Sequence, residues 1–134
     1  MTKPFETRSN ITRLLGIEFI SSDPEAGTIE LAYHPEQRMT NPRGDVQGGV
    51  LAALLDNAMA RALATANEDK IVASTVDMNV SFLRPVKPGR VIGIGRVIRQ
   101  GRTICFLEAE LFDVAGTLLA RGTSTAIPVP IPGT

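Results

Sequence analysis

The chain has 134 residues, of which 43% are hydrophobic and 21% charged, a composition typical of a folded globular protein. Fourteen basic side chains balance fourteen acidic ones, so the overall charge does not favour nucleic acid as a partner. One cysteine and one histidine exclude an internal disulfide and a metal site of the usual ligand spacings. We expect one domain over residues 1–134.

Residues 1–10, MTKPFETRSN, contain no apolar signal region, and no apolar run approaches the ~20 residues of a membrane span. The single Cys105 fits a reducing compartment. We therefore expect a cytoplasmic protein without a membrane partner.

The first half of the chain predicts one hairpin and one helix. Residues 1–15 predict an arm or a short helix. The segments GIEFIS and TIELAYH flank the turn former DPEAG and indicate two short strands or one hairpin. Residues 34–47, rich in Pro, Gly, Asn and Asp, predict a loop. From Gly48 to about Ala66, apolar residues recur at helical intervals and predict one long helix.

The second half predicts sheet. Residues 74–83, STVDMNVSFL, alternate between apolar and polar side chains, as in a half-buried strand. Three further strands follow over residues 91–99, 103–112 and 117–127 and complete an antiparallel meander. Residues 128–134, PVPIPGT, predict a proline-rich tail without a regular element. One helix and about five antiparallel strands form an α+β domain, and the sheet buries the helix most simply by curling around it.

Two adjacent glycines begin the predicted helix, and one aspartate, Asp56, interrupts its apolar run. The glycines are consistent with a simple turn, with Asp45 as the nearest capping candidate for the helix, and Asp56 is consistent with a solvated outer face. That face, however, carries small residues where a solvated face normally carries Lys, Glu, Gln or Arg: Gly49, Ala52, Ala53 and Ala60. Small neighbours indicate close packing or room for a ligand beside the carboxylate.

Glycines at a helix start expose backbone N–H groups at the positive end of the helix dipole, which is the make-up of an oxyanion site. A carboxylate acts as general base or nucleophile, and acyl transfer needs both near one carbonyl. Gly48 and Asp56 are eight residues apart, roughly 12 Å along a regular helix. The two groups therefore meet only if the glycines of one helix face the aspartate of another. The spacing predicts an obligate dimer with two composite sites.

The stretches NPRGDVQGGVLAALLDNA and STVDMNVSFLRPVKPG resemble the PaaI-like hotdog-fold acyl-CoA thioesterases from about Leu15 to Ile127. In that family an Asn-x-x-Gly-x-x-His-Gly-Gly motif leads into the central helix, and a catalytic Asp follows. The resemblance implies a hotdog fold, one long helix wrapped by a curved antiparallel sheet.

By position, the resemblance implies that the Gly48 N–H polarises the thioester carbonyl with help from Asn41. Asp56 of the opposing subunit activates water or attacks directly. Ser74 orients the water, and Thr75 is the neighbouring alternative. Taken from the residues alone, Asn41 is also consistent with an ordinary Asn-Pro turn and Ser74 with a plain strand hydroxyl.

One departure concerns Gln47, which occupies the position of the family's His. Glutamine forms hydrogen bonds but does not titrate near neutral pH. If the His mainly orders the loop, Gln47 substitutes for it; if the His transfers protons, activity is weak or absent. We expect Gln47 and Gly49 to contact substrate. Hotdog dehydratases are disfavoured because they use a catalytic His, and His34 lies outside the motif.

Between Met78 and Leu107 there are six cations and no acid. Four of them lie at predicted strand ends or turns, where binding residues concentrate, and we expect them to hold the phosphates of coenzyme A: Arg84, Lys87, Arg90 and Arg102. Arg96 and Arg99 are better read as solvated sheet residues. An RNA partner is disfavoured because only 4% of residues are aromatic and no stacking platform is evident.

The sequence thus predicts hydrolysis of a small aromatic or short- to medium-chain acyl-CoA to the free acid and CoA. No metal or organic cofactor is implied beyond the coenzyme A of the substrate. We expect a homodimer that associates through its sheet edges into a dimer of dimers. The alternatives are a non-catalytic acyl-CoA-binding hotdog protein, acting as sensor or carrier, and a purely structural dimer.

Overall fold

The computed structural model describes residues 9–132. Of the predicted N-terminal arm or short helix, residues 1–8 lie outside the described residues, and Asn10–Leu14 form helix α2. Ser9 caps α2 by accepting a hydrogen bond from the Thr12 N–H, which satisfies one of the free donors of the first turn.

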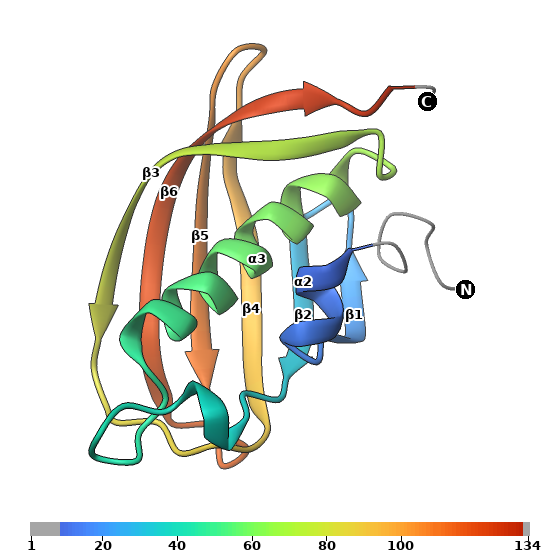
Figure 1. Ribbon diagram of the computed structural model, residues 1–134. Helices are drawn as coiled ribbons and strands as arrows, with labels where there is room; N and C mark the ends of the chain where they lie inside the picture. The colour runs from blue at the N-terminus through green and yellow to red at the C-terminus, as the bar shows by residue number, and fades with distance from the viewer. Residues whose placement is uncertain (1–8, 133–134) are drawn as a thin grey trace.

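The described strands form one antiparallel sheet in the order β1-β2-β4-β5-β6-β3 (Figure 1). The sheet has six strands where the sequence predicts about five, because both arms of the first hairpin join it. Their bounds are β1 Glu18–Asp23, β2 Thr28–Tyr33, β3 Ile71–Phe82, β4 Val91–Gln100, β5 Cys105–Phe112 and β6 Leu118–Pro130.

The predicted meander is confirmed for β4, β5 and β6, but not for β3. The strand β3 pairs with β6, while β4 pairs with β2. The connection between β3 and β4 therefore crosses the end of the sheet, and β3 forms an edge. Local hydrophobic alternation specifies a strand but not its partner, so this crossover is not predictable from the pattern.

The prediction of an irregular tail over residues 128–134 is wrong for its first part, because β6 continues to Pro130. Pro128 pairs with Ala73 and Pro130 with Ile71 on β3. On the other side of β6, pairing with β5 ends at Ala126. Proline is tolerated where no ladder donor is needed, and the missing N–H groups of both prolines point to one side of the strand.

The long helix α3 spans Gly48–Ala66, as predicted, and crosses one face of the sheet (Figure 1). Leu54, Leu55, Ala58 and Met59 on its inner face are completely buried. Gly95 permits the close approach of β4, since a Cβ there would lie 2.1 Å from the Ala58 carbonyl oxygen. No helix among residues 9–132 is both long and apolar enough to cross a membrane.

The edge strand β3 exposes apolar side chains. Val76 and Phe82 are 56% and 53% exposed, and Leu83, directly after the strand, is 50% exposed. The pairing with β6 shifts between Thr75 and Asp77, so β3 contains a bulge at Val76. An apolar sheet edge with unpaired backbone groups is a template for pairing with another chain.

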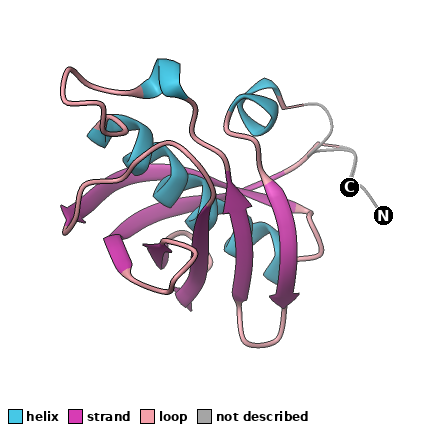
Figure 2. Cartoon of the chain, turned by 90° about the horizontal axis from the view of Figure 1, so that it is seen from below, coloured by secondary structure: helices cyan, strands magenta, loops and turns pink. Residues whose placement is uncertain are grey.

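Two loops meet at one end of the molecule, which faces the viewer in Figure 2. One loop precedes α3 and contains a short 3-10 helix, η1 (Gln37–Met39). The other connects β3 to β4. The Val46 N–H donates to the Val86 carbonyl at 2.7 Å, which fastens the two loops together beside the start of α3.

Candidate functional site

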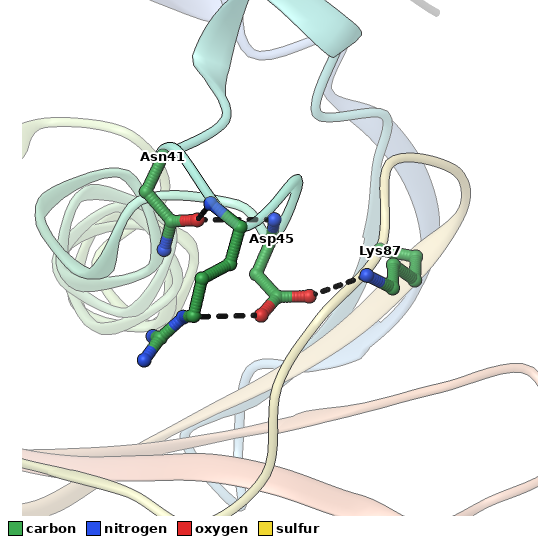
Figure 3. A network of polar contacts seen from close by, with 4 residues as sticks. Asn41, Asp45 and Lys87 are labelled. Atoms are coloured by element: carbon green, nitrogen blue, oxygen red, sulfur yellow. Dashed lines mark hydrogen bonds and ion pairs between the residues drawn. The ribbon is translucent and has the colours of Figure 1, made fainter.

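Asn41 organises the loop before α3 (Figure 3). Its Oδ1 accepts hydrogen bonds from the backbone N–H groups of Arg43 and Asp45, at 3.0 and 3.2 Å. The Asn41 N–H donates to the Asp45 carbonyl at 2.7 Å, and Gly44 occupies a positive φ of 83°, which favours glycine. Because Oδ1 is engaged, the side-chain NH₂ is left as the donor; it has no acceptor among the described residues.

The start of α3 presents unpaired donors. Gln47 is the N-cap residue, and its side chain makes no capping hydrogen bond. The N–H groups of Gly48 and Gly49 have no acceptor among the described residues, as geometry dictates for the first turn of a helix. A Cβ at Gly48 would touch the Phe82 ring at 3.4 Å, whereas a Cβ at Gly49 would meet nothing within 4 Å.

The sequence-based suggestion that Asp45 caps the helix is wrong. The Asp45 side chain is 12% exposed and turns toward two cations. Its Oδ1 lies 2.8 Å from Lys87 Nζ and its Oδ2 lies 3.7 Å from Arg43 Nε (Figure 3). The Lys87 contact is an ion pair without aligned hydrogen-bond geometry. It adds a charged link between the two loops that Val46 and Val86 already join.

Asp56 lies two turns further along α3, half-buried. The Thr75 hydroxyl donates to Asp56 Oδ1 at 2.8 Å, and Oδ2 has no partner among residues 9–132. Ser74 points away, because successive side chains of a strand alternate between faces and its cross-strand neighbour Ile127 is exposed. The structure therefore places the alternative, Thr75, and not Ser74, beside the carboxylate of the same protomer.

A cavity of about 570 Å³ lies between the two fastened loops and the start of α3. The loop before α3 contributes Asn41, Arg43, Asp45, Val46 and Gln47, the helix contributes Gly48 and Leu51, and the segment from Phe82 to Val86 forms the opposite wall. Asn41, Gln47, Gly48 and Arg84 are thus brought together. Asp56 and Gly49 do not line this cavity.

The four cations expected to bind phosphate are dispersed. Arg84 lines the cavity, and Lys87 pairs with Asp45. Arg90 donates to Glu18 at 2.6 Å, and hydrogen bonds from Arg90 and His34 hold the pKa of that carboxyl below its ordinary value. Arg102 lies in the turn between β4 and β5, at the far end of β4 from this cavity.

The sequence reasoning missed Arg43 as a cavity residue and the pairing of Asp45 with Lys87. Arg43 stands inside the motif stretch, two residues after Asn41, so its proximity was the available signal. Arg43, however, lies beside Asp45 and outside the acid-free run from Met78 to Leu107 that marked the other cations. In residues 9–132, no group of three or more His, Cys, Asp or Glu is placed to hold a metal ion.

The model of the thioesterase superfamily matches residues 43–120, more than half of the chain. The chain belongs to the thioesterase superfamily. Acyl-coenzyme A thioesterase 13 of Homo sapiens is 35% identical over 119 residues, which are 87% of this chain and 83% of that protein. An esterase-related protein of Halobacterium salinarum is 32% identical over 84% of this chain and 76% of its own length.

Solved structures of this superfamily share the fold. A phenylacetic acid degradation-related protein of Ralstonia eutropha matches with a TM-score of 0.83 and 35% identity, over 95% of this chain and 92% of that one. The E. coli PaaI protein matches with a TM-score of 0.82 over 97% and 90% of the two chains, at 24% identity, which shows likeness of fold. The expected PaaI-like hotdog fold is confirmed.

Proposed function

We propose that this protein hydrolyses acyl-CoA thioesters to the free acid and CoA, at two composite sites that each combine residues of two protomers. Membership of the thioesterase superfamily makes the chain a thioester hydrolase. The observation that carries the site assignment is the Asp56 carboxylate. It is half-buried on a small-residue face, bonded by Thr75 on one oxygen and without a partner on the other.

The carbonyl of the thioester is polarised by the Gly48 N–H and by the Asn41 side-chain NH₂. Both donors line one cavity and lack acceptors among the described residues. Preorganised donors aimed at a developing oxyanion are typically worth about 10²–10³ in rate for each donor. Because two backbone N–H groups hold Asn41 Oδ1 in place, the side-chain NH₂ is preorganised as such a donor.

Asp56 acts as general base or nucleophile toward the carbonyl, and the Thr75 hydroxyl fixes one of its oxygens. This assigns to Thr75 the role first expected for Ser74. In one protomer, Gly48 and Asp56 lie about 12 Å apart along α3, which is too far for both to contact one carbonyl. A second copy that brings its own α3 alongside removes this difficulty.

The dimer forms at the β3 edge. That edge has unpaired backbone groups and exposed Val76, Phe82 and Leu83, and Thr75 on the same strand contacts Asp56. The open space at Gly49 supports the same arrangement, since nothing in its own protomer requires a glycine there. We place further association, into a dimer of dimers, at the opposite sheet edge, where Phe19 of β1 is 50% exposed.

Gln47 lines the cavity without capping the helix. Its N–H donates to the Met39 carbonyl at 2.9 Å, so its backbone orders the loop. We assign Gln47 a substrate contact and leave proton transfer to Asp56. The acyl group is small aromatic or short- to medium-chain, and the reaction uses no metal or organic cofactor. The single free cysteine, which is buried, supports a cytoplasmic location.

A panel of aromatic and aliphatic acyl-CoAs tests the proposal, with thiol release and thermal stabilisation measured on the same samples. Release of CoA that is lost in Asp56→Asn supports the enzyme and its site. Thermal stabilisation without thiol release in the wild type contradicts hydrolysis and favours the non-catalytic acyl-CoA-binding protein. The absence of both thiol release and thermal stabilisation favours a purely structural dimer.

A further inference from the structure

We propose that Arg43 and Arg84 form the subsite for the phosphate groups of coenzyme A, at the rim of the cavity that contains Gly48. The inference rests on the proposed function, because it requires the thioester carbonyl to lie at Gly48. The subsite keeps Arg84, which the sequence predicted to bind phosphate, and adds Arg43, which it did not. Lys87, Arg90 and Arg102 are not part of it.

The two arginines line the same cavity as Gly48, the proposed donor to the thioester carbonyl. Arg43 belongs to the loop before α3 and Arg84 to the segment after β3, so they come from the two loops that enclose the cavity. Arg43 and Gly48 are five positions apart, and an extended chain of that length spans at most about 18 Å. A ligand held at Gly48 that leaves the cavity between its walls passes both guanidinium groups.

The remaining cations near this end of the molecule are already paired. Lys87 lies 2.8 Å from Asp45 Oδ1, and Arg90 lies 2.6 Å from Glu18 Oε2. A carboxylate beside a cation offsets the positive charge that the cation presents to a phosphate. Lys87 therefore balances Asp45 and adds little net charge to the rim.

The two arginines are better placed for an anion. Arg43 Nε lies 3.7 Å from Asp45 Oδ2, further than Lys87 Nζ lies from Oδ1, and its side chain is 81% exposed. Arg84 is exposed and has no ion-pair partner among the described residues. With Asp45 balanced by Lys87, the rim keeps two positive charges. The planar guanidinium of arginine binds phosphate oxygens in a bidentate manner, which suits the diphosphate and ribose phosphate of CoA.

An anionic group reaches this rim from one of two sources. The phosphates of CoA are one source, and a carboxylate on the acyl group is the other. The exposed position of both arginines, outside the apolar part of the wall formed by Leu51, Phe82 and Val86, favours the CoA end of the substrate. Acyl groups with and without a carboxylate separate the two sources by experiment.

The test compares wild type, Arg43→Gln, Arg84→Gln and the double variant on two thioesters of one neutral acyl group, the CoA thioester and the pantetheine thioester. We expect KM for the CoA thioester to rise roughly tenfold or more in the double variant, with kcat unchanged. KM for the pantetheine thioester, which has no diphosphate, stays at its wild-type value. Added salt raises KM for the CoA thioester in the wild type and less so in the double variant.

The matched control is Arg99→Gln, which removes an exposed cation of β4 that lies outside the cavity; we expect wild-type values on both thioesters. Equal changes of KM on the CoA and pantetheine thioesters, or no change on either, overturn the proposal. If KM of the arginine variants rises only for acyl groups that carry a carboxylate, with CoA and with pantetheine alike, the proposal is also overturned. The arginines then bind the acyl end of the substrate.

Failure of the proposed function is recognised separately by calorimetry with free CoA and free pantetheine. If CoA binds the wild type more tightly than pantetheine and the double variant abolishes that difference, the subsite stands even where no thiol is released. If thioesters are hydrolysed but CoA and pantetheine bind the wild type equally, the proposed function stands and the subsite is wrong.

Discussion

The hydroxyl of Thr75 donates a hydrogen bond of 2.8 Å to Oδ1 of Asp56, which joins the edge strand β3 to the outer face of helix α3. The two residues are separated by 19 positions in the sequence. The bond fixes one carboxylate oxygen and leaves the other without a partner among the described residues. Because β3 is also the unpaired sheet edge, the candidate base is coupled to the surface where a second protomer is proposed to bind.

Asp56→Asn removes the charge while keeping the shape of the side chain. If Asp56 is the general base, turnover falls by about 10²–10⁴, and far-UV circular dichroism and thermal unfolding change little because the residue is only half-buried. A CoA-release assay measures the loss. Wild-type turnover in a correctly folded Asp56→Asn protein would show that another group does the chemistry.

Thr75→Val keeps the branched side chain and deletes only the hydroxyl. We expect lower turnover, by roughly tenfold, because a hydrogen bond to a charged group is worth about 1.5–3 kcal/mol. Thr75→Ser retains the hydroxyl and restores most of the activity. Ser74→Ala serves as the comparison, since Ser74 lies on the other face of β3. A larger loss in Ser74→Ala than in Thr75→Val contradicts the assignment.

Gly48→Pro removes one N–H with little disturbance of the backbone. Proline is favoured at the first helical position, and the preceding Gln47 already has φ −58° and ψ 138°, the extended conformation that proline requires of its neighbour. We expect turnover to fall by about 10²–10³. Gly48→Ala is the control, because it keeps the N–H and places its methyl group at ordinary contact distance from Phe82.

Mixing the two defective proteins tests whether the sites are composite. A heterodimer of Asp56→Asn and Gly48→Pro protomers contains one site with both defects and one site with neither. After unfolding and refolding together, an equal mixture consists of half heterodimers, and we expect it to recover about a quarter of wild-type turnover. No recovery, despite heterodimers detected by native mass spectrometry, would place both groups in a site within one protomer.

Val76→Lys introduces a charge at the bulge of the exposed β3 edge. Lysine on an edge strand opposes edge-to-edge pairing, so we expect a monomer in sedimentation analysis together with loss of thiol release. Val114→Lys, at a 73% exposed position in the turn between β5 and β6 and outside the β3 edge, is the control and stays dimeric. A monomeric Val76→Lys protein with full activity refutes the composite site.

Tyr33 makes the alkaline stability of the fold measurable. It is the one tyrosine of a chain without tryptophan, it is completely buried, and its hydroxyl donates to Asn57 Oδ1 at 2.9 Å. Burial raises the pKa of its phenol far above the ordinary value.

A folded-state pKa above the unfolded value leaves stability intact below the unfolded value, near pH 10, and lowers it as the pH rises further. We therefore expect phenolate absorbance to appear together with the loss of circular dichroism. Tyr33→Phe shifts the alkaline unfolding midpoint upward, apart from any uniform loss of stability at neutral pH. A phenolate spectrum in a protein that keeps native circular dichroism contradicts the prediction.

The sequence by itself determined the elements and the family. The helical spacing of apolar residues from Gly48 to Ala66 and the alternation of residues 74–83 are local patterns, so they predict α3 and most of β3 directly. The motif from Asn41 to Asp56 predicted the hotdog fold and named the candidate base and donors. The bounds of β3 and β6 moved by three residues where proline and turn residues weaken the pattern.

Only the tertiary structure decided which groups meet. Whether Ser74 or Thr75 faces Asp56 depends on the face of β3 that packs against α3, and a shift of one residue reverses it. The pairing of β3 with β6 leaves β3 as an edge, and the meeting of two loops turns Asp45 from a suggested cap into the partner of Lys87. These relationships join residues far apart in the chain, and they depend on packing and register, which local residue patterns do not specify.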